Sequence, residues 1–256
     1  MNKGELRTRL IPTLLLDGDG LYKTIGFKNR SYIGDPINIV KIFNVKEVDE
    51  ILILDISVTK EKRDIQWDLL SDIVSECFMP VSYGGGIKDI ETISRLNHLG
   101  IEKIVLNSVA LNDLSFVKEA VNRFGASTIC VAINVKRNIF GKYKIYDYVR
   151  DTLTKIDLTK FIEVLNEIGV GELLVVDADR EGTLKGLDKN IIKFTNNSTD
   201  IPVVFSGGLS CVDELRDLVK FELSGIGVGS VFVYQGPHRA VLVSYPTEDE
   251  LFKILN

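Results

Sequence analysis

The glycine pattern in this sequence occurs twice, at a fixed spacing. A short apolar run, a glycine turn and a helix-like pattern occupy Val81–Asp89 in that order, and the same order returns from Pro202–Leu209 onward. The turn glycines Gly85 and Gly207 are 207 − 85 = 122 positions apart. A spacing shared by several features indicates an internal duplication.

Two further pairs keep almost the same distance. Asn107-Ser108 is followed 122 positions later by Gly229-Ser230, and the apolar strand ending at Asp55 is matched to one ending at Asp179, 179 − 55 = 124 positions later. We therefore interpret the chain as two equivalent halves, at about 1–125 and 126–256.

The fold class follows from what each half contains. Short Val/Ile/Leu runs alternate with amphipathic helical stretches, which predicts a parallel sheet covered on both faces. Four βα units per half give eight in a chain of 256 residues, which suits a single-domain (β/α)8 TIM barrel over residues 1–256. A doubly wound open sheet is the alternative, but it gives no reason for two equal halves.

We expect the following elements. The strands are Arg9–Leu16, Glu50–Ile56, Val81–Tyr83, Lys103–Asn107, Ile129–Val135, Glu172–Asp177, the apolar part of Pro202–Leu209, and Gly225–Gly229. The helical stretches include Pro36–Val45, Trp67–Cys77, Ser115–Phe124, Asp157–Ile168, Val212–Val219 and Glu248–Leu255. Two insertions are expected at the barrel mouth: an excursion at Leu21–Phe27 that carries Lys23, and a hairpin at Asn138–Tyr148. The excursion is either a substrate loop or a plain surface hairpin.

Composition excludes several classes of function. A net charge of −5 argues against nucleic acid as the main partner. No apolar run is long enough for a membrane span and the first residues lack a signal peptide core, so we expect a cytoplasmic protein. Cys77, Cys130 and Cys211 are predicted to be buried thiols in a reducing compartment. Only His98 and His238 occur, neither in ligand spacing, so we expect no metal, no cofactor and no Ser-His-Asp triad.

The duplicated glycine turns are candidates for two phosphate sites. Backbone N–H groups at a strand–turn–helix junction, with small hydroxyls, can hold a phosphate dianion. The candidates are Gly86, Asn107 and Ser108 in one half and Gly182, Gly208, Gly229 and Ser230 in the other. A duplicated site predicts a ligand phosphorylated at both ends, although glycine turns also serve plain chain reversal.

Charged residues occur at both ends of the predicted barrel. Strand alternation places Asp55, Asp179 and Glu181 near the mouth, where each could act in the site or cap a helix. At the opposite end, the floor, four strands begin with a charged residue: Arg9, Glu50, Lys103 and Glu172. These four could form a salt-bridge ring that plugs the floor, or a gate on an axial passage.

Several of these segments together resemble a known protein family. The segments that carry the resemblance are Arg9–Leu14, Gly34–Pro36, Asp49-Glu50, Leu54–Ile56, Gly84–Ile87, Val131–Ile133, Asp179–Thr183 and Ser206–Gly208. In order and over nearly the whole chain, they are similar to the cyclase subunit of imidazole glycerol phosphate synthase. The resemblance implies a two-half barrel that binds a glutaminase subunit at its N-terminal face, the floor. Ammonia would pass along the barrel axis to a bis-phosphorylated ribonucleotide at the mouth, and the family's four-charge ring falls on the four floor residues.

The sequence departs from that family at its acid–base pair. The two aspartates expected at the ends of strands 1 and 5 are replaced by Leu15 and Asn134. Leucine transfers no proton and asparagine only hydrogen-bonds, and loss of a general acid or base typically costs ~10²–10⁴-fold. The chain therefore looks like the divergent paralogues associated with surface-polysaccharide sugars, in which the glutaminase–barrel pair supplies ammonia for an amidino-sugar.

Three hypotheses follow. The first is an ammonia-delivering barrel subunit of a glutamine amidotransferase, with a small phosphorylated substrate oriented by Asn134 and Asp179. The second is a true imidazole glycerol phosphate synthase subunit of histidine biosynthesis, with Asp179 or Asp55 in a rearranged acid–base pair. The third is a non-catalytic protein that binds a phosphorylated ligand and activates the glutaminase.

Overall fold

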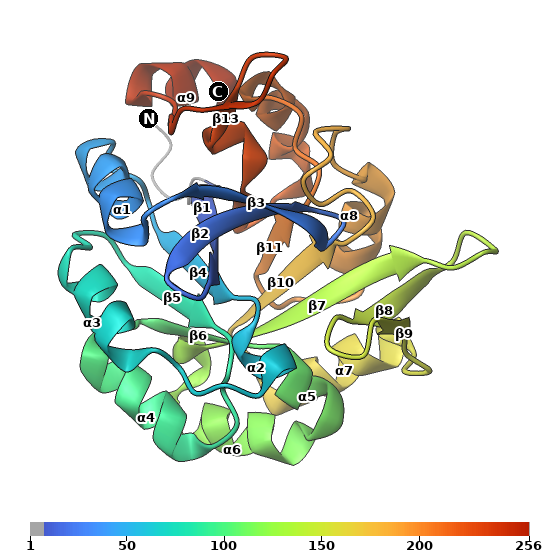
Figure 1. Ribbon diagram of the computed structural model, residues 1–256. Coiled ribbons are helices and arrows are strands. Elements are labelled where there is room, and N and C mark those ends of the chain that lie inside the picture. The colour runs from blue at the N-terminus through green and yellow to red at the C-terminus, as the bar shows by residue number, and fades with distance from the viewer. Residues whose placement is uncertain (1–7, 256) are drawn as a thin grey trace.

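Parallel strands close into a barrel in the computed structural model of this chain, which describes residues 8–255 (Figure 1). The barrel strands are β1 (Arg9–Asp17), β4 (Ile51–Asp55), β5 (Val81–Gly84), β6 (Lys103–Leu106), β7 (Ile129–Arg137), β10 (Glu172–Asp177), β11 (Val203–Ser206) and β12 (Gly225–Val228). Each pairs in parallel with the next, and β12 pairs with β1 with Gly225 opposite Arg9, which closes the barrel. The (β/α)8 fold expected from the sequence is confirmed.

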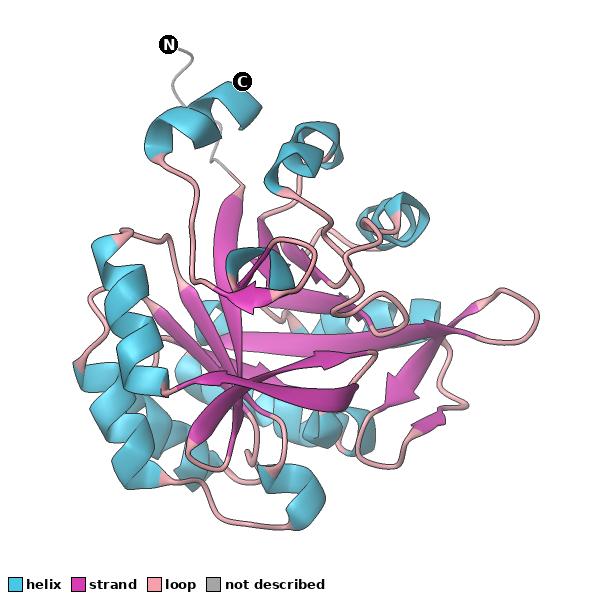
Figure 2. Cartoon of the chain, turned by 45° about the horizontal axis from the view of Figure 1, so that its top comes forward, coloured by secondary structure: helices cyan, strands magenta, loops and turns pink. Residues whose placement is uncertain are grey.

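Helices surround the strands (Figure 2). They are α1 (Pro36–Val45), α2 (Val58–Glu61), α3 (Trp67–Ser75), α4 (Ile90–Leu99), α5 (Ser108–Asn112), α6 (Leu114–Phe124), α7 (Leu158–Ile168), α8 (Lys189–Asn196) and α9 (Glu248–Leu255). An aspartate side chain caps the N-terminus of five of them, accepting an otherwise unpaired backbone N–H. These caps are Asp35, Asp89, Asp113, Asp157 and Asp188.

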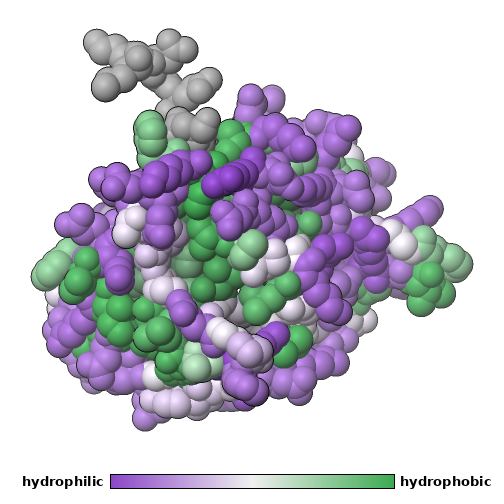
Figure 3. Space-filling model, turned by 90° about the horizontal axis from the view of Figure 1, so that it is seen from above, coloured by the Kyte–Doolittle hydropathy of each residue, from purple (hydrophilic) through white to green (hydrophobic). Residues whose placement is uncertain are grey.

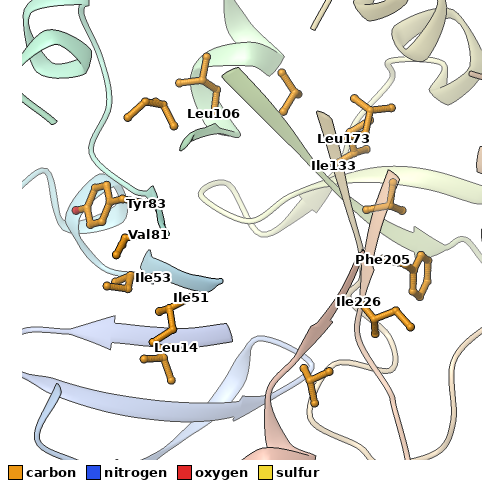
Figure 4. Packing of buried hydrophobic residues seen from close by; sticks show 14 of the residues in the cluster. Leu14, Ile51, Ile53, Val81, Tyr83, Leu106, Ile133, Leu173, Phe205 and Ile226 are labelled. Atoms are coloured by element: carbon orange, nitrogen blue, oxygen red, sulfur yellow. The ribbon is translucent and has the colours of Figure 1, made fainter. Parts of the chain in front are cut away.

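The hydrophobic core has two parts because successive strand residues point to opposite faces. Outward-facing side chains such as Ile53, Tyr83 and Phe205 pack between the strands and the helices (Figure 4). A smaller cluster fills the inside of the barrel: Ile11, Leu52, Val105, Cys130, Ala132, Leu174, Val176 and Val204. The barrel interior is therefore apolar between its two charged or polar ends.

Two hairpins extend the barrel at the carboxyl ends of its strands. β2 (Gly20–Ile25) and β3 (Lys28–Gly34) form the excursion expected after the first strand. β7 continues past the barrel and pairs with β8 (Tyr143–Asp147), as the expected insertion does. The tip of this second hairpin is the apolar projection at the right edge of Figure 3, where Ile139 and Phe140 are 93% and 79% exposed. The short strand β9 (Thr152–Leu153) pairs with β8.

The segment after β11 differs from its prediction. The pattern at Val212–Val219 predicted a helix, but the structure has two 3-10 turns, η2 (Val212–Asp217) and η3 (Val219–Phe221). The Glu214 carboxylate accepts the backbone N–H groups of Leu187 and Ser210, which ties the first turn to neighbouring loops. Further 3-10 turns are η1 (Ala126–Thr128) and η4 (Ser230–Phe232), and β13 (Tyr234–Gln235) pairs with β14 (Ala240–Val241).

The prediction of three buried thiols is also corrected. Cys130 is buried and Cys77 is half-buried, but Cys211 is exposed because it lies at the start of η2 on the surface. The first residues, Met1–Arg7, on which the signal-peptide prediction rests, lie outside the described residues. Within residues 8–255, no helix has the length and apolar character needed to cross a membrane.

The structure also corrects the partner of Asp55 in the internal repeat. A Cβ added to Gly85 would lie 2.5 Å from the Asp55 carbonyl oxygen, and one added to Gly207 would lie 2.6 Å from that of Asp177. Asp55 thus corresponds to Asp177, 177 − 55 = 122 positions later, and not to Asp179. Both aspartates end a strand, and both accept the N–H groups two and three residues ahead.

Candidate functional site

A cavity of about 440 Å³ opens at the carboxyl ends of the barrel strands. All seven residues predicted to bind phosphate line it: Gly86, Asn107, Ser108, Gly182, Gly208, Gly229 and Ser230. Leu15, Lys23, Asp55, Asn134 and Glu181 line it as well. The β2–β3 hairpin covers part of the opening, because Thr24 and Phe27 also contribute to the lining.

The first glycine cradle consists of Gly86, Asn107 and Ser108, at the ends of β5 and β6. Gly85 and Gly86 both have positive φ, at 124° and 69°, which favours glycine at these two positions. The Gly86 N–H donates to the hydroxyl of Thr59, 3.0 Å away. The Asn107 side-chain amide donates to the Ala132 carbonyl at 2.7 Å, so its position is fixed by the neighbouring strand.

The second cradle, formed by Gly208, Gly229 and Ser230, carries a buried cation. Lys23 is 3% exposed, and its ammonium lies 2.8 Å from the point that a Cβ on Gly229 would occupy. Burial lowers the pKa of Lys23 to about 8, against the attraction of the Glu181 carboxylate. Its one described hydrogen bond goes to the Thr13 carbonyl, although an ammonium has three donors.

Glu181 fixes the β2–β3 hairpin over the cavity. Its carboxylate accepts the Thr24 hydroxyl at 2.9 Å and the Phe27 N–H at 3.1 Å. Burial raises the pKa of Glu181, and these hydrogen bonds oppose that shift. Gly182 lies so close to the hairpin that an added Cβ would overlap the Thr24 carbonyl oxygen, so this glycine contacts the hairpin as well as the cavity.

Of the other two candidate carboxylates, Asp55 lines the cavity and Asp179 does not. Asp55 lines the cavity and caps the turn before α2, accepting the Ser57 and Val58 N–H groups at 3.1 and 3.0 Å. Its Oδ2 atom is buried and has no hydrogen-bond partner in residues 8–255. Asp179 is not among the cavity residues, and its carboxylate accepts the Arg137 N–H at 2.8 Å. Asp179 therefore does not line the cavity with Asn134, because its carboxylate is held at the Arg137 N–H at the end of β7.

The positions of the missing acid–base pair face this cavity. Leu15, near the end of β1, and Asn134, in β7, both line it and both are at most 8% exposed. In the resemblance described above, these are the places of the two proton-transferring aspartates. Neither side chain that stands there can exchange a proton at neutral pH.

Four charged side chains close the opposite end of the barrel. Arg9 pairs with both Glu50 and Glu172, and the Lys103 ammonium lies 2.7 Å from Glu172 and 3.6 Å from Glu50. Burial alone would lower the pKa of Arg9, but the Glu172 and Glu50 carboxylates outweigh it and raise the pKa. The four residues predicted from the strand starts thus form one closed ring.

A second, small cavity lies directly inside the ring. It measures about 10 Å³ and is lined by Glu50, Ser82, Lys103, Cys130 and Glu172, together with apolar side chains. Leu52, Val105 and Leu174 line both this cavity and the large one, so a thin apolar layer separates them. The two ends of the barrel are thus aligned on one axis.

Sequence reasoning missed several cavity residues. Thr59, in α2, and Phe27 and Tyr148, in turns, line the cavity through contacts that depend on the tertiary fold. Phe27 packs edge-on against Tyr148, with ring centroids 5.6 Å apart, and the Tyr148 hydroxyl donates to the Ile56 carbonyl at 2.6 Å. Within residues 8–255, no group of three or more His, Cys, Asp or Glu side chains is arranged to hold a metal ion.

The closed barrel, with a glycine-lined cavity at one end and a charge ring at the other, defines a class of (β/α)8 proteins with a small-molecule site at the mouth. A model of the family described as histidine biosynthesis protein matches residues 9–238, and the chain belongs to this family.

Similar proteins support a HisF-like place within it. The chain is 37% identical over 247 residues to a Pseudomonas aeruginosa protein provisionally named imidazole glycerol phosphate synthase subunit hisF2, covering 96% of this chain and 98% of that one. A Leptospira interrogans protein, provisionally named as subunit HisF, is 37% identical over 96% and 97% of the two chains. The Petrotoga mobilis imidazole glycerol phosphate synthase subunit HisF is 32% identical over 90% and 91%.

Proposed function

We propose that this barrel receives ammonia from a glutaminase bound at its floor and delivers it to a phosphorylated acceptor in the large cavity. The observation that carries the proposal is the axial order of four features. From the floor upward, these are the charge ring, a cavity of about 10 Å³, an apolar layer and a cavity of about 440 Å³. This order supports a route along the barrel axis, which would open where the charge ring and the apolar layer now close it.

The size and polarity of the passage fit ammonia. About 10–15 Å³ is roughly the room that one water-sized molecule needs, and ammonia is similar in size. The layer of Leu52, Val105 and Leu174 favours a neutral molecule, since burial of an unpaired ion costs far more than burial of a neutral hydrogen-bonding group. Ammonium would therefore leave its proton on the floor side.

The floor side of the barrel has exposed apolar side chains. Val45, at the end of α1, is 83% exposed, and Phe78, in the segment before β5, is 88% exposed. Asn44 links these two segments, since its side-chain oxygen accepts the Phe78 N–H at 3.1 Å. Exposed apolar side chains beside a polar ring are what a docked subunit would cover.

The mouth is suited to an anionic ligand. Lys23 is a buried cation whose ammonium donates one hydrogen bond within residues 8–255, and it lies against Gly229 of the second cradle. A phosphate there would accept charge-assisted hydrogen bonds from the remaining donors of the Lys23 ammonium. The first cradle lines the same cavity, and two cradles in one cavity favour an acceptor with a phosphate at each end.

The reaction differs from the ring closure of the histidine pathway. By the resemblance, Leu15 and Asn134 stand where the family has its acid–base pair, and both line the cavity, so in this proposal the acceptor reacts with ammonia without those two proton transfers. Together with the resemblance to the divergent paralogues, this favours an acceptor in the biosynthesis of an amidino-sugar of a surface polysaccharide, in the cytoplasm.

One observation favours a second candidate. Asp55 has a buried, unpartnered carboxylate oxygen in a cavity residue, and burial raises its pKa. It could serve as a replacement proton donor in a histidine-pathway cyclase. Turnover of the bis-phosphorylated ribonucleotide of that pathway with ammonium salt separates the two candidates. Our proposal expects no detectable turnover by this chain; turnover that is lost in Asp55→Asn would favour the second.

A further inference from the structure

The two glycine cradles differ in the groups that face them. In the second, Gly229 faces the buried ammonium of Lys23. In the first, the N–H of Gly86 already has an acceptor, the hydroxyl of Thr59 at 3.0 Å. Nothing in the sequence repeat predicts this hydroxyl, because Thr59 belongs to the short helix α2 after β4 and not to a glycine turn.

The Thr59 hydroxyl occupies the place in which a phosphate oxygen would accept the Gly86 N–H. Thr59 and Gly86 both line the large cavity, so a ligand in the cradle meets both groups. The Thr59 residue is exposed, which leaves its side chain free to rotate. A hydroxyl accepts one hydrogen bond and donates another, so the same group can hold the N–H in one state and donate to a phosphate in the other.

The backbone that carries Thr59 is fixed. Asp55 accepts the N–H groups of Ser57 and Val58, which anchors the turn before α2. The Val58 side chain packs against Gly86, since a Cβ added there would lie 3.0 Å from Val58 Cγ2. When a ligand enters this cradle, the Thr59 hydroxyl can therefore reorient while the backbone of α2 stays in place.

We propose that Thr59 is a phosphate-binding residue of the first cradle. Its hydroxyl satisfies the Gly86 N–H while the cradle is empty. When a phosphate arrives, a phosphate oxygen takes over that N–H, and the hydroxyl turns to donate to the phosphate. This inference rests on the proposed function, because it requires that the cradle binds a phosphorylated ligand.

Inorganic phosphate is the probe for the test, with the backbone amide resonances of Gly86 and Gly229 as separate reporters of the two cradles. Thr59→Val removes the hydroxyl and keeps the shape, and Thr59→Ser keeps the hydroxyl. A hydrogen bond to a charged group is worth about tenfold in affinity or more. We expect Thr59→Val to weaken phosphate binding at Gly86 about tenfold and to leave Gly229 unchanged, with Thr59→Ser close to the parent protein.

The outcomes distinguish this inference from the function beneath it. If phosphate perturbs both amides in the parent protein and Thr59→Val binds it equally well or more tightly at Gly86, the role of Thr59 is wrong and the phosphate cradles stand. If phosphate perturbs neither amide in the parent protein, the cradles do not bind phosphate, and that result overturns both. A loss in Thr59→Ser equal to that in Thr59→Val would also overturn the role of the hydroxyl.

Discussion

Lys103 joins the two acidic residues of the barrel floor: its ammonium lies 2.7 Å from the Glu172 carboxylate and 3.6 Å from that of Glu50. Arg9 makes the same double contact from the other side. The two carboxylates are thus each paired twice, in an environment where their side chains are at most 9% exposed. Any passage through the floor has to open a contact of this ring.

Removing Lys103 should destabilise the protein. Lys103→Met leaves two buried carboxylates to share one guanidinium, and breaking a buried ion pair costs about 3–5 kcal/mol. We expect the free energy of unfolding, measured with urea, to fall by about 3 kcal/mol. Lys189→Met is the matched control, because its pair with Asp217 is exposed and should contribute less than about 1 kcal/mol. Equal losses in the two variants would contradict a buried ring.

The buried carboxyl of Asp177 predicts a pH dependence of stability. Burial raises its pKa from 3.8 to about 6. The folded protein then binds this proton more tightly than the unfolded chain, so the stabilisation is complete below about pH 4 and is lost as the pH rises through about 6. The loss amounts to roughly 2–3 kcal/mol.

Comparison with Asp177→Asn isolates this effect. The amide stays neutral and can still accept the N–H groups of Asp179 and Arg180. We expect its stability relative to the parent protein to rise by roughly 2–3 kcal/mol between pH 4 and pH 7. A constant difference between the two proteins over this range would show that Asp177 is ionised throughout.

Lys23 should control phosphate binding at the second cradle. Its pKa of about 8 means that the free protein loses this charge as the pH rises through 8. We expect affinity for inorganic phosphate, measured by calorimetry, to fall between pH 7.5 and pH 9.5. Lys23→Met should bind about tenfold more weakly and show a flatter profile. Lys142→Met, on the exposed tip of the β7–β8 hairpin, is the control and should behave as the parent protein does.

The exposed apolar side chains of the floor should contribute to glutaminase binding. Phe78→Ser removes an aromatic ring that is 88% exposed in the segment leading into β5, on the floor side of the barrel. Truncation of an aromatic side chain at the centre of an interface costs about 2 kcal/mol or more, so we expect at least a tenfold weaker complex. Phe140→Ser is the control, since this ring is 79% exposed at the opposite end of the barrel. A loss of affinity in Phe140→Ser alone would move the docking site to the mouth.

The sequence predicted the barrel and its two ends because both depend on strand periodicity. Arg9, Glu50, Lys103 and Glu172 each start a strand, and parallel strands in one barrel must bring those starts together. The internal repeat predicted the two glycine cradles, and in the structure both cradles line the same cavity. These features depend on which residues start each strand and on the repeated turns, and both can be read directly from the sequence.

The features that could not be predicted from the sequence depend on contacts between segments that are distant in the chain. Asp179 was paired with Asp55 because both follow apolar runs, whereas the backbone geometry identifies Asp177. Thr59 reaches Gly86 only because the short helix α2, which follows β4, lies beside the cradle. The burial of Lys23 depends on how the β2–β3 hairpin closes over the cavity, and Glu181, distant in sequence, fixes that closure. Hydrophobic periodicity contains no information about such contacts.

The proposal that a glutaminase feeds ammonia into this barrel is tested most directly by the rate of glutamine hydrolysis. The rate is measured for the glutaminase subunit of the same organism, with and without this barrel. We expect the two proteins to form a complex at micromolar concentration and the rate to rise at least tenfold on mixing, with Phe78→Ser shifting the rise to higher barrel concentration. An unchanged rate, with the two proteins eluting separately in size-exclusion chromatography, would contradict the claim that a glutaminase feeds ammonia into this barrel.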